Sequence, residues 1–202
     1  INMKKLEWDT KFWGLNIYDM PYSKNVTLSS YNISDERYLI QALVDPKNLS
    51  YIHELESKGF RFQEIKVTLM KKILPVNKTV NRFMFKEISP DDLAGSIGIF
   101  GELFWRNSRY NVFSEEMVGK FYYTWMINSS LGKMDDKSMG YYVNDILAGF
   151  VTYKIRNSSL IIGLFGVMPE FQGQGVAQNL LNFVSEIAIE NEVELISVDT
   201  QG

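Results

Sequence analysis

The residues best suited to chemistry stand in one short stretch, Gln172-Gly173-Gln174-Gly175-Val176-Ala177. Its glycines have no side chain, so backbone N–H groups can converge on a ligand there without steric interference. An apolar stripe typical of a helix begins at Val176, and a helix N-terminus carries about half a positive charge. Together these features predict a site for an anion such as a pyrophosphate, and such a site requires no lysine.

Three phosphate-binding loops could account for this stretch. A P-loop requires Gly-Lys followed by Ser or Thr, which is missing here. A dinucleotide fingerprint requires a third glycine where the chain has Gln178. The third pattern is Gln/Arg-x-x-Gly-x-Gly/Ala, and with Gln172, Gly175 and Ala177 the chain resembles this coenzyme A loop of the GNAT acetyltransferases. A plain glycine-rich turn before a helix is the alternative.

The surrounding elements must place this loop at the end of a buried strand. An almost unbroken apolar run over 160–167 predicts that strand, helical spacing predicts a helix over 176–188, and a second buried strand follows over 195–198. We expect the two strands to be parallel. A strand, two helices and a hairpin come before them, an order that resembles the GNAT fold over 82–199. The resemblance implies an α/β (α+β) fold with a mixed, mostly antiparallel sheet, a splayed parallel strand pair and flanking helices.

Gly163 and Gly166 lie inside the apolar strand, where glycine often marks a bulge or a close backbone approach. In GNAT proteins this strand bulges and splays from the next one, and the pantetheine arm pairs with its free edge. The resemblance assigns that role to Phe165, Gly166 and Val167. Tight packing of the glycines against a neighbouring aromatic ring is the alternative explanation.

A proline among polar residues at 74–79 predicts a linker between two units. We expect a small N-terminal α/β unit over 3–76 and the GNAT acetyl-CoA-binding domain over 80–202. The patterns in the first unit predict a strand over 12–18, a helix over 34–44, a helix from Asn48 to Lys58 stopped by Gly59, and a strand over 60–69.

Other parts of the chain resemble bacterial TDP-fucosamine acetyltransferases, namely residues 6–16 and the stretch from 106–110 to 121–125. These enzymes acetylate the 4-amino group of a TDP-linked 4-amino-4,6-dideoxygalactose, so the resemblance implies a nucleotide-linked amino sugar as acceptor. Arginine suits a diphosphate through bidentate contact, and aromatic faces can stack on a sugar or a base. The candidate substrate residues are Trp105, Arg106, Arg109, Tyr110 and Tyr123.

Four of these candidates also have a structural explanation, which is core packing for Trp105, Tyr110 and Tyr123 and a surface ion pair for Arg109. The acceptor could also be another amine, such as a protein N-terminus, a polyamine or an antibiotic. A non-catalytic CoA-binding module is an alternative of a different class.

The mechanism that the resemblance implies is direct attack of a neutral amine on the thioester, with backbone N–H near Val167 stabilising the oxyanion. Without cysteine, an acyl-enzyme on a thiol is excluded. No residue of the chain is predicted as catalytic acid or base. Strand 160–167 lacks the glutamate base of some relatives, and the general-acid tyrosine of the family is expected on a helix beyond Gly202. The closing helix and final strands of the domain are therefore expected to be missing.

Composition narrows the functional classes that remain for this chain. The formal net charge is −3, which disfavours nucleic-acid binding by charge. The sole histidine, His53, excludes a multi-histidine metal site, so no metal is expected. The co-substrate that the GNAT resemblance implies is acetyl-CoA. No stretch approaches the roughly 20 apolar residues that span a bilayer. We expect a cytoplasmic protein that acts on a small-molecule amine. The sequence is also compatible with a homodimer.

Overall fold

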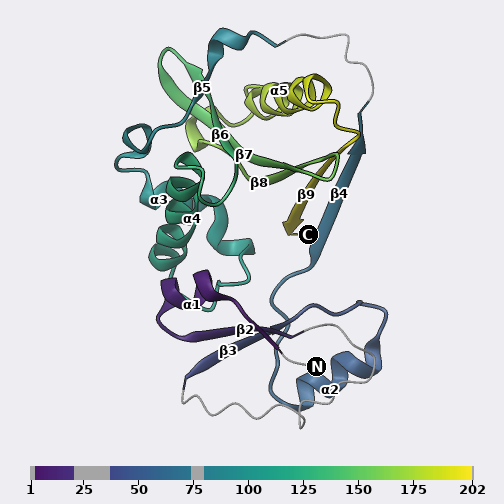
Figure 1. The fold of residues 1–202 in the computed structure, drawn as a ribbon. Coiled ribbons are helices and arrows are strands. Elements are labelled where there is room, and N and C mark those ends of the chain that lie inside the picture. The colour runs from purple at the N-terminus through teal and green to yellow at the C-terminus, as the bar shows by residue number, and fades with distance from the viewer. Residues whose placement is uncertain (1–2, 21–36, 74–79, 202) are drawn as a thin grey trace. The chain divides into compact units, whose positions relative to one another are not determined.

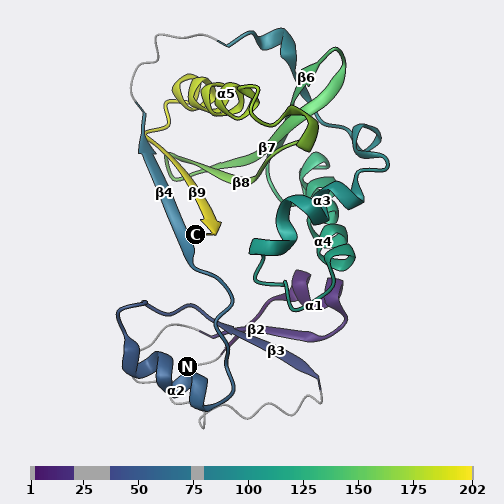
Figure 2. The same ribbon diagram turned by 180° about the vertical axis from the view of Figure 1, so that it is seen from behind.

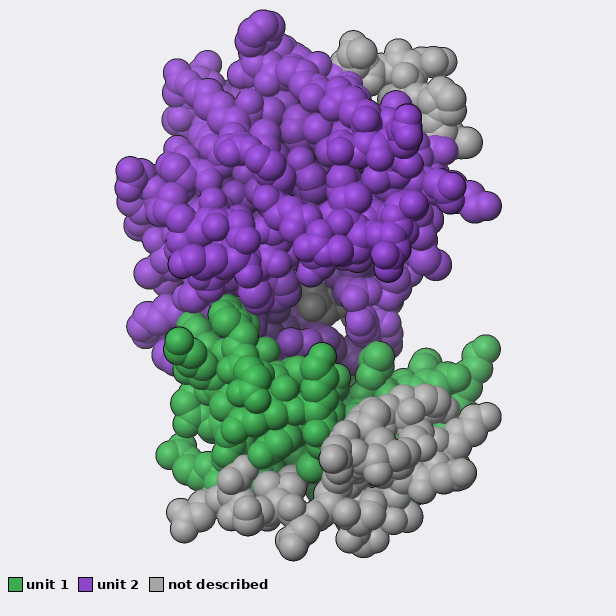
Figure 3. Space-filling view, in the orientation of Figure 1, with its two compact units in different colours: residues 1–62 green, residues 63–202 purple. Residues whose placement is uncertain are grey.

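A computed structural model describes residues 3–20, 37–73 and 80–201 (Figure 1). The chain forms two compact units, residues 1–62 and residues 63–202, which Figure 3 colours separately. In the described ranges, no helix has both the length and the apolar character needed to cross a membrane.

The described residues of unit 1 form a three-stranded sheet and two helices. Strand β2 (Asn16–Met20) lies in the middle, antiparallel to β1 (Lys4–Lys5) and parallel to β3 (Tyr38–Ala42). Helix α1 (Glu7–Trp13) connects β1 to β2, and α2 (Leu49–Ser57) follows β3. The side chains of Met20, Tyr51 and Leu55 form a small buried core.

Two sequence predictions for unit 1 are wrong. Phe12 and Trp13 belong to helix α1, because Gly14 ends that helix with a left-handed φ of 64° and the strand starts only at Asn16. Residues 38–42 form a strand because they pair with β2 in parallel register; residues 34–36 of that predicted helix lie outside the described residues. The helix after Asn48 is confirmed, and the Asn48 side chain accepts a hydrogen bond from the Tyr51 N–H.

The boundary between the units lies between Phe62 and Gln63 rather than at 76–80. Strand β4 (Lys66–Lys72) belongs to unit 2 because it pairs antiparallel with β9 (Leu195–Gln201) along its whole length. Of the predicted strand over 60–69, only the part from Lys66 onward belongs to a paired strand. The linker predicted at 74–79 lies outside the described residues.

Unit 2 is built on a six-stranded sheet of order β4-β9-β8-β7-β6-β5. The remaining strands are β5 (Phe85–Glu87), β6 (Lys137–Val143), β7 (Ile146–Arg156) and β8 (Ser159–Val167). All neighbouring strands are antiparallel except β8 and β9, which are parallel. This sheet confirms the mixed, mostly antiparallel arrangement with one parallel pair.

Helices cover both faces of this sheet (Figures 1 and 2). Helix α5 (Val176–Glu190) packs on one face, where its apolar side chains join Val151 and Tyr153 of β7 in the main core. Helix α3 (Ile97–Phe104) lies on the other face, because Phe100 stacks on Phe150 with ring centroids 5.3 Å apart. Successive residues of a strand point to opposite faces, so Phe150 and Val151 separate the two layers.

Side-chain caps begin two of the helical segments before the hairpin. Ser89 and Asp92 form a capping box, but the helix that they start is a short 3-10 turn (Pro90–Leu93). Gly95 has a φ of 81° and separates this turn from α3, so the first of the two helices predicted before the hairpin is divided into two pieces. Ser114 caps α4 (Glu115–Ser130). The predicted hairpin is present, and its turn consists of the left-handed residues Asn144 and Asp145 between β6 and β7.

Candidate functional site

Strands β8 and β9 diverge in the middle of the sheet, as Figures 1 and 2 show. Their parallel pairing joins Ser159–Ile162 to Leu195–Val198 and stops there. Beyond Ile162, β8 stays paired with β7 as far as Val167, whereas β9 continues alongside β4. The splayed strand pair expected from the sequence is therefore present, and among the described residues no strand pairs with this edge of β8 over 163–167.

The backbone N–H groups along this part of β8 point alternately toward β7 and toward the open edge. The N–H of Leu164 donates to Thr152 Oγ1 (2.8 Å), and the N–H of Met168 donates to the Ala148 carbonyl (2.9 Å), so both point toward β7. Because N–H directions alternate along a strand, those of Phe165 and Val167 point to the open side. On that side, the Gln172 side-chain amide donates to the Val167 carbonyl at 3.3 Å. Two backbone N–H groups thus face the space left by the splay.

The glycine-rich turn follows at the end of β8. A short 3-10 turn (Pro169–Phe171) leads into it, and Gly173 and Gly175 have left-handed φ values of 74° and 80°. Gly175 caps α5 without a side-chain hydrogen bond. The helix geometry leaves the first N–H groups of α5 without intrahelical acceptors. This is the arrangement predicted for an anion site, and its positive potential comes from the backbone.

A groove of about 630 Å³ joins the two features. It is lined by the open edge of β8, the glycine-rich turn, the first turns of α5 and the end of α3. Its lining residues are Leu103, Phe104, Phe165, Gly166, Val167, Phe171, Gln172, Gly173, Gly175, Val176, Ala177, Gln178 and Leu181. The described lining contains no charged side chain.

The groove brings together the predicted cofactor residues with one exception. Gln174 does not line it, because its side-chain amide turns back to the Glu170 carbonyl at 2.8 Å. Sequence reasoning missed five lining residues: Leu103, Phe104, Phe171, Gln178 and Leu181. Gln178 and Leu181 could have been found, since they lie within one helical turn of Ala177. Leu103 and Phe104 carried only the signal of an apolar helix stripe.

Both glycines inside β8 are required by close packing. A Cβ on Gly166 would lie 2.5 Å from the ring of Phe150, so the predicted packing against an aromatic is observed. A Cβ on Gly163 would lie 2.3 Å from the carboxylate of Asp135, a residue that the sequence did not single out. Neither position leaves room for a side chain.

The predicted substrate residues lie in and after the turn that follows α3. Arg106 is exposed, and Trp105, Arg109 and Tyr123 are partly buried. The Trp105 indole donates to the Phe113 carbonyl (3.0 Å), and the Arg109 guanidinium lies over the ring of Tyr110. Tyr110 itself has no exposed surface. In this conformation it is a core residue and offers nothing to a substrate.

Comparison with known proteins identifies the family. A model described as the acetyltransferase (GNAT) family matches residues 100–202, half of the chain. The chain belongs to the GNAT family of acetyltransferases. The enzyme class and co-substrate predicted from the sequence, acetyl-CoA-dependent N-acetyl transfer, are confirmed at the level of this family.

A solved acetyltransferase structure has the same fold. The chain is similar to a GCN5-related N-acetyltransferase from Sphaerobacter thermophilus, with 15% identity and a TM-score of 0.54, over 81% of this chain and 50% of that protein. A PaiA N-acetyltransferase from Thermoplasma acidophilum, solved with coenzyme A, is 19% identical over 54% of this chain and 73% of that one, with a TM-score of 0.42. The chain thus spans only half the length of the first of these proteins. No curated protein matches.

Ionisable groups around the site have defined partners. Asp199 lies on β9 just past the last residue paired with β8. Its partial burial opposes ionisation, but hydrogen bonds from Lys66 (2.8 Å) and Thr68 (2.6 Å) outweigh that effect, so the pKa of Asp199 is lowered. Within the described ranges, no group of three or more His, Cys, Asp or Glu side chains is placed to hold a metal ion.

Proposed function

We propose that this chain transfers the acetyl group of acetyl-CoA directly to the amine of a nucleotide-linked amino sugar of the TDP-4-amino-4,6-dideoxyhexose type. The observation that supports the donor half is the groove between the open edge of β8 and the glycine-rich turn. In this proposal, the N–H groups of Phe165 and Val167 pair with the pantetheine arm. The backbone from Gly173 to Ala177, with Gln172 beside it, holds the pyrophosphate.

The reaction has a simple balance. The amine nitrogen attacks the thioester carbonyl, a C–N bond forms, the C–S bond breaks, and the thiolate leaves with a proton while the ammonium loses one. A backbone N–H group near Val167 can stabilise the developing oxyanion. Keeping this edge free of a neighbouring strand is what gives the thioester access to it.

The acceptor half rests on Trp105, Arg106, Arg109 and Tyr123. Trp105 and Arg106 directly follow Leu103 and Phe104, which line the groove at the end of α3, and Arg109 comes three residues after Arg106. Guanidinium groups at this place suit a nucleotide diphosphate. An uncharged groove lining provides no such recognition, so the charged contacts must come from residues beside it.

A panel of amines tests this proposal. Acetyl-CoA turnover is measured with TDP-linked 4-amino sugars, unlinked amino sugars, polyamines and N-terminal peptides. We expect turnover with the TDP-linked sugars and at least tenfold less with the same sugars lacking the nucleotide, since one well-made charged contact is worth about that factor. Turnover with peptides or polyamines alone would overturn the acceptor and leave the donor site standing.

A further inference from the structure

The bulge in β8 lies where this strand leaves β9. Val151 pairs with Phe165 and Tyr153 pairs with Ile162, so Thr152 faces two residues, Gly163 and Leu164. One extra residue in β8 produces this shift. A bulge bends the strand that carries it and increases its twist. Since pairing with β9 ends at Ile162, the bulge begins at the residue where the open edge begins.

Thr152 supplies the hydrogen bond that the bulge requires. Its side chain is fully buried, and its hydroxyl oxygen accepts the N–H of Leu164 at 2.8 Å. The only hydroxyl proton is then donated to Asp135 Oδ2 at 2.6 Å. The result is an ordered chain of two hydrogen bonds, from the Leu164 backbone through Thr152 to the Asp135 carboxylate.

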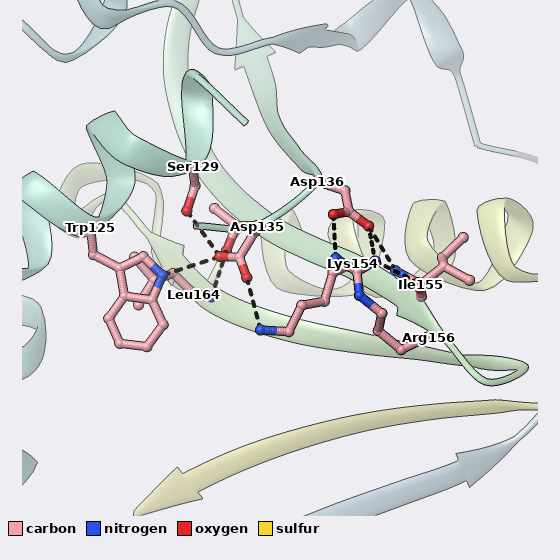
Figure 4. Close-up of polar contacts among 9 residues, drawn as sticks. Trp125, Ser129, Asp135, Asp136, Lys154, Ile155, Arg156 and Leu164 are labelled. Carbon is pink, nitrogen blue, oxygen red and sulfur yellow. Dashed lines mark hydrogen bonds and ion pairs between the residues drawn. The ribbon is translucent and has the colours of Figure 1, made fainter. Parts of the chain in front are cut away.

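Asp135 is a buried carboxylate with donors from several elements (Figure 4). It is 2% exposed, and Oδ2 also accepts hydrogen bonds from Ser129 (2.9 Å) and the Trp125 indole (3.1 Å) of α4. The Lys154 ammonium lies 3.7 Å from the other oxygen, Oδ1. The carboxylate also occupies the space above Gly163 that a Cβ would need. Asp135 therefore ties α4 and β7 to the bulged segment of β8.

We propose that Asp135 and Thr152 are positioning residues for the acetyl-CoA site. They fix the bulge at Gly163–Leu164, and the bulge sets the direction of the Phe165 and Val167 N–H groups that follow it. This inference rests on the proposed assignment of that edge to the pantetheine arm and thioester. A carboxylate suits the task because it only accepts, so the Thr152 proton must point to it and the hydroxyl must accept from Leu164.

A matched pair of variants tests the inference in the full chain. Thr152→Val keeps the shape and removes the hydroxyl, whereas Thr152→Ser keeps the hydroxyl. Calorimetry measures binding of acetyl-CoA and of adenosine 3′,5′-bisphosphate, which has no pantetheine arm. We expect Thr152→Val to lower the affinity for acetyl-CoA roughly tenfold, the factor typical of one lost hydrogen bond. Its affinity for the bisphosphate should stay within about twofold of that of the unmodified chain. Thr152→Ser should bind both as the unmodified chain does.

Asp135→Asn provides the second measurement if Thr152→Val does not fold, because it keeps an oxygen for Thr152 but loses the charge. Hydrogen exchange should then be faster over 163–167 and unchanged in α5. Equal weakening of both nucleotides, or no weakening in a folded variant, would overturn the inference. The assay contains no acceptor amine, so a wrong amino-sugar assignment does not affect it. An unmodified chain that binds neither nucleotide would overturn the donor site together with this inference.

Discussion

Gly166 and Phe150 occupy adjacent space across β8 and β7, so that a Cβ added to Gly166 would lie 2.5 Å from Phe150 Cζ. Phe150 in turn stacks on Phe100 of α3, with ring centroids 5.3 Å apart. The same glycine lines the groove. A core contact on one face of the sheet therefore sets the position of the backbone that forms the wall of the candidate site.

This relationship predicts that Gly166→Ala damages both stability and binding. Overpacking a core typically costs about 1–3 kcal/mol, and the displaced strand should bind acetyl-CoA more weakly. Phe150→Leu makes room for the new methyl group, so the double variant should recover part of both losses. Thermal unfolding and calorimetry measure the coupling between the two sites, and strictly additive losses would contradict the proposed contact.

The glycine-rich turn provides a second prediction with an internal control. Gly175 (φ 80°) and Gly132 (φ 66°) are both left-handed, and a Cβ at either position meets nothing within 4 Å. Gly175→Ala and Gly132→Ala should therefore each cost about 1–2 kcal/mol of unfolding free energy from backbone strain alone. Only Gly175→Ala should weaken binding of CoA, because Gly132 is not among the groove residues. Comparable weakening by both variants would argue that the turn does not hold the ligand.

Most of unit 2 could be predicted from the sequence because its signals are local. The apolar run of β8 and the stripe of α5 define long elements, and Ser114 and the Asn144-Asp145 turn mark their neighbours. The glycine-rich turn could be predicted for the same reason, since its chemistry depends on consecutive residues. These signals do not require knowledge of what packs against them.

The failures of sequence reasoning share a non-local cause. Tyr38–Ala42 was predicted as helix, but pairing with β2 makes it a strand. Lys66–Lys72 joined the wrong unit because its partner, β9, lies more than a hundred residues later. Asp135 stands in a polar loop, and only the glycine at 163 hinted that something large would occupy the space above that strand. Long-range pairing of this kind overrides local preference.

The proposed acceptor site predicts that a substitution there changes the KM for the acceptor but not the affinity for acetyl-CoA. Arg106 is exposed, so Arg106→Gln should leave the fold intact. The loss of a charged contact to a diphosphate should raise the KM for the nucleotide-linked acceptor roughly tenfold or more, with the acetyl-CoA affinity unchanged. Arg156→Gln is the control, because Arg156 pairs with Asp136 at the far end of β7. If the control raises the acceptor KM as much as Arg106→Gln does, the effect is one of net charge.

The pairing of Asp199 with Lys66 and Thr68 joins β9 to β4 and predicts an acid-dependent loss of stability. Because the folded-state pKa of Asp199 lies below the ordinary value of 3.8, the folded chain binds this proton less readily than the unfolded chain. The contribution of ionised Asp199 to the free energy of unfolding is therefore fully present above the pKa that this group has in the unfolded chain. It is lost as the pH falls through the folded-state pKa. The groups are partly exposed, so it should amount to roughly 0.2–1 kcal/mol.

Asp199→Asn makes this dependence measurable. Urea unfolding of the variant and the unmodified chain should differ at about pH 7 and converge as the pH falls through the folded-state pKa of Asp199, because the protonated aspartate is then neutral like the asparagine. Asp145→Asn removes a similar exposed partner, of Lys86, away from β4 and β9, and it shows how much any surface carboxylate contributes. Hydrogen exchange of 66–72 should become faster only in Asp199→Asn. A difference that stays constant down to the lowest pH would mean that Asp199 acts through its shape and not through its charge.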